Sequence, residues 1–159
     1  MRRETSVVLF LCSGNYYRSR FAEHLFNHLV AGTGLGYEAD SAGLWPDCRT
    51  RNVGSIAPQT LDALRARGVT LPAEHREPRD VTEDDIRDAA VTVALKEAEH
   101  RLLVAGRFPN LLDRVEFWHV HDIDAAPPSE AIPALERNVR GLIARLAERN
   151  SEARAPESP

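Results

Sequence analysis

The sequence predicts a single α/β domain in which a four-stranded parallel sheet is flanked by helices. Short apolar segments alternate along the chain with segments in which apolar residues recur at helical spacing, and this strand–helix order is typical of parallel sheets. The length fits one domain, because 159 residues with 43% hydrophobic content suffice for a single core. The chain contains no internal repeat that would indicate a larger architecture.

The first strand is expected at residues 7–12, a continuous apolar run of the kind that is buried on both faces of a sheet. Gly14 interrupts this run, and apolar residues at helical spacing over residues 21–30 predict a helix. Three glycines close that helix, and residues 37–41 predict a short second strand. The chain therefore begins with a strand–loop–helix–strand unit.

The middle of the chain continues the alternation. Residues 58–67 predict a helix with a proline near its start and a glycine just past its end. After a loop over residues 71–79, Thr82 predicts another helix start, with an aspartate in place of the glutamate of a capping box. Residues 89–95 then predict the third buried strand.

The last part of the chain supplies the fourth strand and two helices. Residues 97–105 predict a short helix closed by a glycine, and residues 115–120 predict the strand. Ser129 is expected to cap a long final helix. We expect the folded domain to cover residues 1–149 and the polar, proline-bearing residues 150–159 to form a disordered tail.

Charge and cysteine content exclude several classes of protein. The net charge of −4 and the sequence pI of about 5.9 argue against a nucleic-acid binder, whose domain is usually basic. Cys12 and Cys48 are too few for a disulfide-stapled secreted scaffold, and no apolar run reaches the ~18 residues of a membrane span. We therefore expect a cytoplasmic protein with reduced Cys12 that binds neither membranes nor nucleic acid. Because no cluster has metal-ligand spacing, we expect no metal or other cofactor.

A cysteine, five residues and an Arg-Ser pair lie between the first strand and the first helix. The segment comprises Cys12, Ser13, Gly14, Asn15, Tyr16, Tyr17, Arg18 and Ser19. Its backbone N–H groups can turn inward as an anion-binding nest, and the positive end of the helix points to the same place. Arg18 can grip two phosphate oxygens as a planar fork, and the same field favours the thiolate of Cys12. The segment is therefore a candidate phosphate-binding loop, with Cys12 as nucleophile and Arg18 as clamp.

The spacing alone is weak evidence, because arginine is abundant in this chain. The context strengthens it, since an apolar strand ends on the cysteine and Arg-Ser opens an amphipathic helix. Ligands of α/β sheets bind beyond the carboxyl ends of the strands, which is where Cys12 is expected. The alternative interpretation, a buried core thiol, leaves these features unexplained.

Residues 8–23 resemble the signature of the low-molecular-weight protein tyrosine phosphatases. That family begins with an apolar strand, continues with Cys-x-Gly-Asn-x-Cys-Arg-Ser, and then has a helix carrying Ala-Glu, which here is Ala22-Glu23. The resemblance continues through residues 40–43 and 52–54 and spans nearly all of residues 6–146.

The resemblance implies a phosphomonoester hydrolase of the protein-tyrosine-phosphatase kind that works through a cysteinyl-phosphate on Cys12. The substrate would be a phosphorylated protein or a small phosphomonoester, and the product would be inorganic phosphate. An aspartic acid would protonate the leaving oxygen and then activate water. Asp122 lies where the family has this residue, and Asp124 is the fallback.

The resemblance also implies a set of supporting residues. Ser19 would donate a hydrogen bond to the sulfur of Cys12. Asn15, Ser41 and His75 would hold the loop in shape. For each of these last three, a local turn or cap hydrogen bond is the alternative interpretation.

Some positions depart from the family pattern. Tyr17 replaces the second loop cysteine, and we expect Cys48 to be an inert surface thiol. The aromatic residues that flank a phenyl ring in the family are also replaced. Either Tyr16 and Trp45 supply the missing walls, or the mouth of the site suits another phosphomonoester.

The charges near the loop differ from the family as well. Arg20 stands where the family usually has proline, and with Arg49 and Arg51 it could form a basic rim that prefers acidic substrates. Lys96 stands where the family usually has an acidic residue.

Two rival functions remain open on the sequence. An arsenate reductase would need an external thiol, because Cys48 is the only cysteine besides Cys12. A phosphate- or phosphopeptide-binding module with weak catalysis is suggested by the absence of a proline after either Asp122 or Asp124.

Overall fold

A parallel sheet forms the centre of the computed structural model, which describes residues 5–45, 52–121 and 126–154. Within these residues the sheet has four strands: β1 (Ser6–Cys12), β2 (Tyr37–Gly43), β3 (Val91–Ala94) and β4 (Val115–Phe117). Their order is β2-β1-β3-β4, and each neighbouring pair is parallel. The predicted fold class is therefore confirmed.

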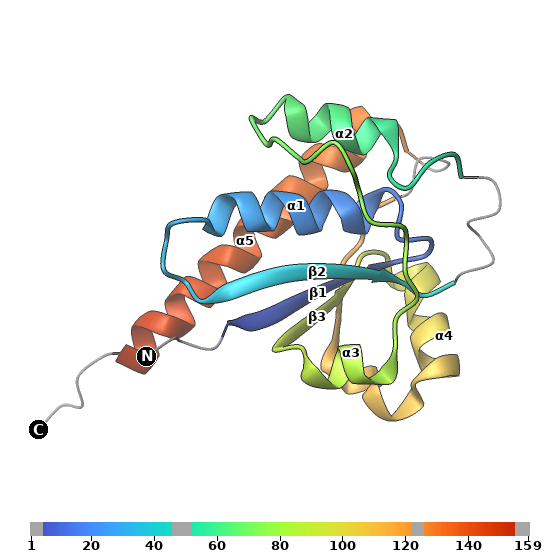
Figure 1. Cartoon of the computed structure of the whole chain (residues 1–159). Helices are drawn as coiled ribbons and strands as arrows, with labels where there is room; N and C mark the ends of the chain where they lie inside the picture. The colour runs from blue at the N-terminus through green and yellow to red at the C-terminus, as the bar shows by residue number, and fades with distance from the viewer. Residues whose placement is uncertain (1–4, 46–51, 122–125, 155–159) are drawn as a thin grey trace, which may run out of the picture.

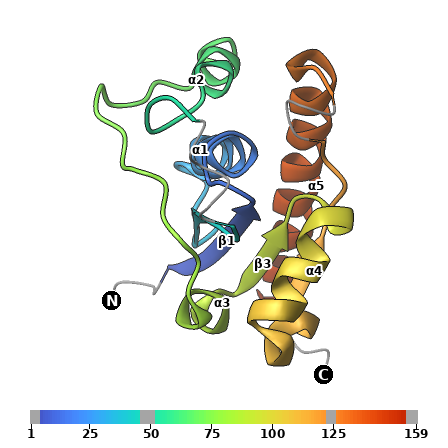
Figure 2. The same ribbon diagram turned by 90° about the vertical axis from the view of Figure 1, so that its right-hand side faces the viewer.

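Helices cover both faces of this sheet (Figure 1). They are α1 (Arg18–Val30), α2 (Pro58–Arg65), α3 (Glu83–Asp88), α4 (Glu97–Arg107) and α5 (Pro128–Arg154), with a 3₁₀ helix η2 (Pro109–Arg114) before β4. Helices α1, α2 and α5 lie on one side, and α3 and α4 lie on the other, as Figure 1 and the turned view in Figure 2 show.

The central strand β1 explains how one apolar run serves two cores. Val8 and Phe10 pack in the cluster that includes α1 and α5, whereas Leu9 and Leu11 pack in the cluster that includes α3 and α4. All four side chains are almost completely buried. Side chains of a strand alternate between faces, so a strand covered on both faces is apolar at every position.

Several predicted boundaries differ from the structure by a few residues. One predicted boundary is confirmed, since the capping box at Thr82 is present, with Asp85 bonded back to the Thr82 backbone. Others differ: strand β4 ends at Phe117, because its partner β3 ends at Ala94, with which Phe117 is in register. Gly106 does not end its helix, since α4 continues to Arg107.

Both ends of the last helix also differ from expectation. Ser129 is not the cap: α5 begins at Pro128, and the Pro127 carbonyl accepts the N–H groups of Glu130 and Ala131. A proline suits the first helical position, because its missing N–H has no partner there in any case. At the other end α5 continues past residue 149 to Arg154, and Asn150 Nδ2 donates to the Leu35 carbonyl at 2.8 Å. The domain limit at residue 149 stays a prediction.

No helix in the described part of the chain combines the length and the apolar character that crossing a bilayer requires.

Candidate active site

The loop over residues 13–17 joins β1 to α1 at the carboxyl end of β1. Cys12 is the last residue of the strand, and Arg18 is the first residue of the helix. The backbone after β2 holds this loop, because the N–H groups of Leu44 and Trp45 donate to the carbonyls of Cys12 and Ser13, each at 2.9 Å. The loop therefore lies at the sheet edge where α/β proteins bind ligands.

Gly43 lets the two backbones approach this closely. A Cβ at this position would lie 2.9 Å from the Ser13 carbonyl oxygen and 3.3 Å from the carbonyl carbon of Gly14. Both are backbone atoms and cannot rotate away. Any side chain at Gly43 would therefore displace the loop, which explains why glycine ends β2.

Cys12 is almost completely buried, and its Sγ lies 2.9 Å from Ser19 Oγ. Ser19 Oγ also accepts a hydrogen bond from Asn15 Nδ2 at 2.9 Å. The hydroxyl proton of Ser19 is not used in that bond and can be donated to another acceptor. A thiolate can only accept hydrogen bonds, so in that state Ser19 donates to Cys12. Ser19 is therefore placed to donate a hydrogen bond to the nucleophilic sulfur at the base of the loop.

Asn15 organises the loop around its own side chain. Its φ of 54° lies in the left-handed region, which asparagine tolerates better than most residues. Its amide donates to Ser19 Oγ and to Ser41 Oγ, both at 2.9 Å. Its Oδ1 accepts from Arg76 Nη1 at 2.9 Å and from the Arg79 backbone N–H at 3.1 Å. The fully buried amide thus has four hydrogen bonds, which fix this unusual conformation.

Among the described residues, Val120 and Glu99 contact Arg18 from outside the loop. Its Nη1 donates to the Val120 carbonyl at 3.0 Å, and its Nη2 lies 3.4 Å from Glu99 Oε2. Burial favours the neutral form of Glu99, but the charges of Arg18 and Lys96 outweigh it and lower the pKa of this carboxyl. Lys96 stands where the family usually has an acidic residue, and Glu99 supplies the carboxylate one turn later on α4. The sequence did not identify Glu99 as part of the site.

His100 is a second residue that the sequence missed. Its Nδ1 accepts the Lys96 backbone N–H at 3.0 Å, so the ring proton lies on Nε2, which faces Ser13 Oγ at 3.1 Å. Complete burial, reinforced by the Arg18 charge, lowers the pKa of His100 to about 3. The neutral ring therefore ties Ser13 to the start of α4.

This burial makes a testable prediction about acid stability. The unfolded chain protonates His100 below about pH 6.5, whereas the folded chain does so only near pH 3. The stabilisation from neutral His100 is therefore complete above pH 6.5 and lost as the pH falls, by about 2 kcal/mol at about pH 5. Because burial also lowers the pKa of His24, that residue contributes in the same direction.

The measurement is urea unfolding at a series of pH values. We expect His100→Gln to have a shallower loss of stability between neutral pH and pH 5 than the wild type, because glutamine keeps one donor and one acceptor but does not titrate. His28→Gln, at an exposed position on α1, should keep the wild-type slope. Equal slopes for His100→Gln and the wild type would show that His100 does not control acid sensitivity.

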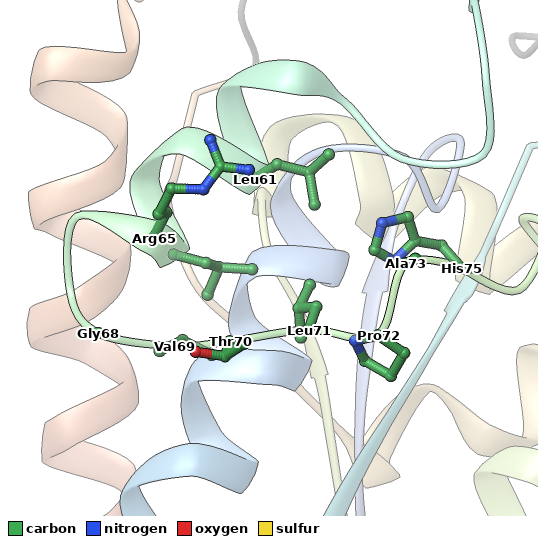
Figure 3. A pocket seen from close by; sticks show the side chains of 10 residues that line it. Leu61, Arg65, Gly68, Val69, Thr70, Leu71, Pro72, Ala73 and His75 are labelled. Carbon is green, nitrogen blue, oxygen red and sulfur yellow. The ribbon is translucent and has the colours of Figure 1, made fainter.

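The structure brings Arg76, rather than His75, to the loop. His75 lines a separate cavity of about 380 Å³ between α2 and the segment that follows it (Figure 3). A match to the family pattern does not determine which of these two neighbouring residues contacts Asn15, and here it is Arg76. Ser41 does reach the loop, through Asn15.

Arg20 is not on a basic rim. Only 1% of it is exposed, and its Nη1 donates to the carbonyls of Ser55 and Arg76, at 3.1 and 3.0 Å. Burial, with a smaller effect of the Arg76 charge, lowers the pKa of Arg20. The Arg20 guanidinium thus binds backbone carbonyl groups inside the protein and does not face the solvent. The other two arginines of the predicted rim, Arg49 and Arg51, lie outside the described residues.

Two aromatic residues flank the loop. Tyr16 donates its hydroxyl proton to the Val53 carbonyl at 2.7 Å. Trp45, whose backbone bonds to Ser13, is 51% exposed. Tyr17 is buried in the core, and its carbonyl accepts from Thr60 Oγ1 at 3.0 Å.

The candidate general acids, Asp122 and Asp124, lie outside the described residues, as does Cys48. The described segment before them ends at His121, directly after Val120, whose carbonyl contacts Arg18. Within the described ranges, no group of three or more His, Cys, Asp or Glu side chains could hold a metal ion.

Comparison with known proteins gives one family over nearly the whole chain. The family described as low molecular weight phosphotyrosine protein phosphatase matches residues 7–151. A protein-arginine-phosphatase of Bacillus subtilis is 27% identical over 108 residues, which cover 68% of this chain and 67% of that protein.

Solved structures show the same fold. A low molecular weight protein tyrosine phosphatase from T. tengcongensis matches with a TM-score of 0.71 at 25% identity, covering 91% of this chain and 99% of that one. A thioredoxin-dependent arsenate reductase of Corynebacterium glutamicum matches with a TM-score of 0.64 at 23% identity. The match covers 91% of this chain and 63% of the reductase chain, and at this identity it shows the fold alone.

Proposed function

The chain belongs to the low molecular weight phosphotyrosine protein phosphatase family, and from this premise we propose that Cys12, Arg18 and Asp122 carry out its reaction on phosphotyrosine in proteins. It is a cysteine-dependent phosphatase, and its family acts on phosphorylated protein substrates with release of phosphate. The observation that carries the proposal is the buried Cys12 sulfur, 2.9 Å from Ser19 Oγ at the base of the loop that leads into Arg18.

Substrate binding uses the loop from Ser13 to Ser19. Its backbone N–H groups and the first turn of α1 attract the phosphate dianion. Arg18 grips two of the phosphate oxygens as a fork, and its contacts with Val120 and Glu99 set the orientation of that fork. These donors stabilise the charge on the equatorial oxygens during the reaction.

The first chemical step transfers the phosphoryl group to sulfur. The Cys12 thiolate attacks phosphorus, the S–P bond forms, and the bond from phosphorus to the tyrosine oxygen breaks. Asp122 donates its proton to that oxygen, so that tyrosine leaves neutral. The product of this step is a cysteinyl-phosphate and an Asp122 carboxylate.

The second step releases phosphate. The Asp122 carboxylate takes a proton from water, the water oxygen bonds to phosphorus, and the S–P bond breaks. Inorganic phosphate leaves, Cys12 returns to the thiolate, and Asp122 is again protonated. The reduced thiol that this cycle requires fits the cytoplasm better than an oxidising compartment.

Phosphoarginine is the second candidate substrate, because a protein-arginine-phosphatase is among the relatives. Trp45 is exposed and its backbone bonds to the loop at Ser13, so its indole is the candidate wall for the planar ring of phosphotyrosine. We expect a higher kcat/KM for a phosphotyrosine peptide than for the phosphoarginine peptide of the same sequence. Release of phosphate from each peptide measures this preference. A further assay tests whether the protein reduces arsenate when a thioredoxin system is supplied.

A preference for the phosphoarginine peptide would replace phosphotyrosine as the substrate. Reduction of arsenate without hydrolysis of either peptide would instead favour the rival reductase function.

A further inference from the structure

Arg76 donates hydrogen bonds to the phosphate-binding loop and to two elements that pack beside it. Its Nη1 donates to Asn15 Oδ1 at 2.9 Å and to the Glu77 carbonyl at 3.0 Å. Its Nη2 donates to the carbonyl and hydroxyl oxygens of Ser41, at 2.8 and 3.0 Å, and to Glu23 Oε1 at 3.0 Å. One guanidinium thus joins the loop, strand β2 and helix α1.

Glu23 is the nearer of two carboxylates that pair with Arg76 Nη2, at 3.0 Å, and the other is Asp40, at 3.5 Å. Glu23 accepts from Ser41 Oγ at 2.6 Å and from Arg76 at 3.0 Å through the same oxygen, and its side chain is only 11% exposed. A carboxylate this buried is costly unless it is paired and hydrogen-bonded. The Arg76 guanidinium is therefore the ion-pair partner of this buried carboxyl group, and the Asn15 contact comes from the same side chain.

The backbone of Arg76 is also fixed. Arg20, which is buried on α1, donates to the Arg76 carbonyl at 3.0 Å and to the Ser55 carbonyl at 3.1 Å. The backbone N–H of Arg79, three residues later, bonds to Asn15 Oδ1. Arg76 is thus held on the side of α1 and presented to Asn15 from a defined position.

We propose that Arg76 is a positioning residue that acts through Asn15 to hold the loop in its anion-binding conformation. Asn15 has a left-handed backbone and orients Ser19, the partner of Cys12. When Arg76 is removed, Asn15 Oδ1 loses one of its two donors and Glu23 loses its salt bridge to Arg76. The loop then no longer holds its backbone N–H groups in the anion-binding arrangement, and the hydrogen bond between Ser19 and the Cys12 sulfur is lost.

This inference rests on the proposed function only in its kinetic readout, because inorganic phosphate binding can be measured without turnover. Arg76→Gln should lower kcat/KM for para-nitrophenyl phosphate by roughly 10- to 100-fold, the range of couplings between contacting residues. It should weaken the binding of inorganic phosphate, measured by calorimetry, by a similar factor. Arg76→Lys should recover part of both, because lysine restores the cation for Glu23 but not the planar fork.

His75→Ala is the matched control, because the adjacent residue lines the separate cavity and should leave both quantities within about twofold of the wild type. Asn15→Ala gives the second test. If Arg76 acts through Asn15, Arg76→Gln should cost much less in the Asn15→Ala background than in the wild type.

Two results would overturn the inference. One is a phosphate affinity and kcat/KM within twofold of the wild type for Arg76→Gln, or for Arg76→Lys should the glutamine variant not fold. The other is full additivity with Asn15→Ala. A wild type that hydrolyses nothing, but whose phosphate affinity falls when Arg76 is replaced, would instead contradict the proposed function and leave this inference standing.

Discussion

Replacement of Cys12 by serine is expected to abolish turnover of para-nitrophenyl phosphate while inorganic phosphate still binds. The serine hydroxyl is far less acidic than a thiol, so the nucleophile is lost. The loop amides, Arg18 and the contacts of Asn15 do not depend on the sulfur. Turnover is measured with the nitrophenyl ester, and phosphate or vanadate binding is measured by calorimetry on the same preparation.

Cys48→Ser is the matched control for this experiment. It removes the only other cysteine, which the sequence predicts to be an inert surface thiol, and should leave turnover unchanged. Near-wild-type turnover by Cys12→Ser would overturn the assignment of the nucleophile. Loss of both turnover and phosphate binding would show that the sulfur also maintains the loop.

The second large effect is expected at Asp122. A general acid helps most when the leaving group is poor, because the leaving oxygen then needs a proton as its bond breaks. Asp122→Asn should therefore slow hydrolysis of phenyl phosphate by roughly 10²- to 10⁴-fold, the usual contribution of acid–base catalysis. The loss should be smaller for the nitrophenyl ester, and the decline of activity toward alkaline pH should flatten.

Asp124→Asn is the control for Asp122. Asp122 follows Val120 by two residues. The Val120 carbonyl contacts Arg18, so the chain passes beside the proposed phosphate clamp just before Asp122. Asp124 is two residues farther along and should change apparent substrate affinity only mildly. If the leaving-group-dependent loss appears in Asp124→Asn, the two roles are exchanged. If it appears in neither variant, water supplies the proton.

The sheet and the loop could be predicted because their signals are local. An apolar run that ends on Cys12 indicates a strand buried on both faces, and Gly-Asn followed by Arg-Ser indicates the turn into α1. The boundaries were less predictable. Strand β4 ends where β3 no longer offers a partner, and pairing between distant segments cannot be derived from the composition of either one.

The polar contacts around the loop required the structure. Glu99, His100 and Arg76 come from segments far along the chain, and only the tertiary fold brings them to the loop. The sequence showed that Lys96 departs from the family pattern, but it did not show that Glu99 would provide the carboxylate for Arg18.

The exchange of His75 and Arg76 has the same origin, since a match to a pattern does not show which of two neighbouring residues faces Asn15. Arg20 is comparable: its charge predicted a surface position, whereas two backbone carbonyls bind it inside the protein.

The central claim is that the reaction passes through a phosphoryl group bound to the sulfur of Cys12. Rapid acid quenching during turnover of para-nitrophenyl phosphate, followed by mass spectrometry of peptides, tests it most directly. The account predicts one added phosphoryl group on the peptide that contains Cys12, appearing within the first turnover and absent when substrate is omitted. Steady turnover with no phosphorylated enzyme, together with direct transfer of the phosphoryl group to water with inversion at phosphorus, would contradict it.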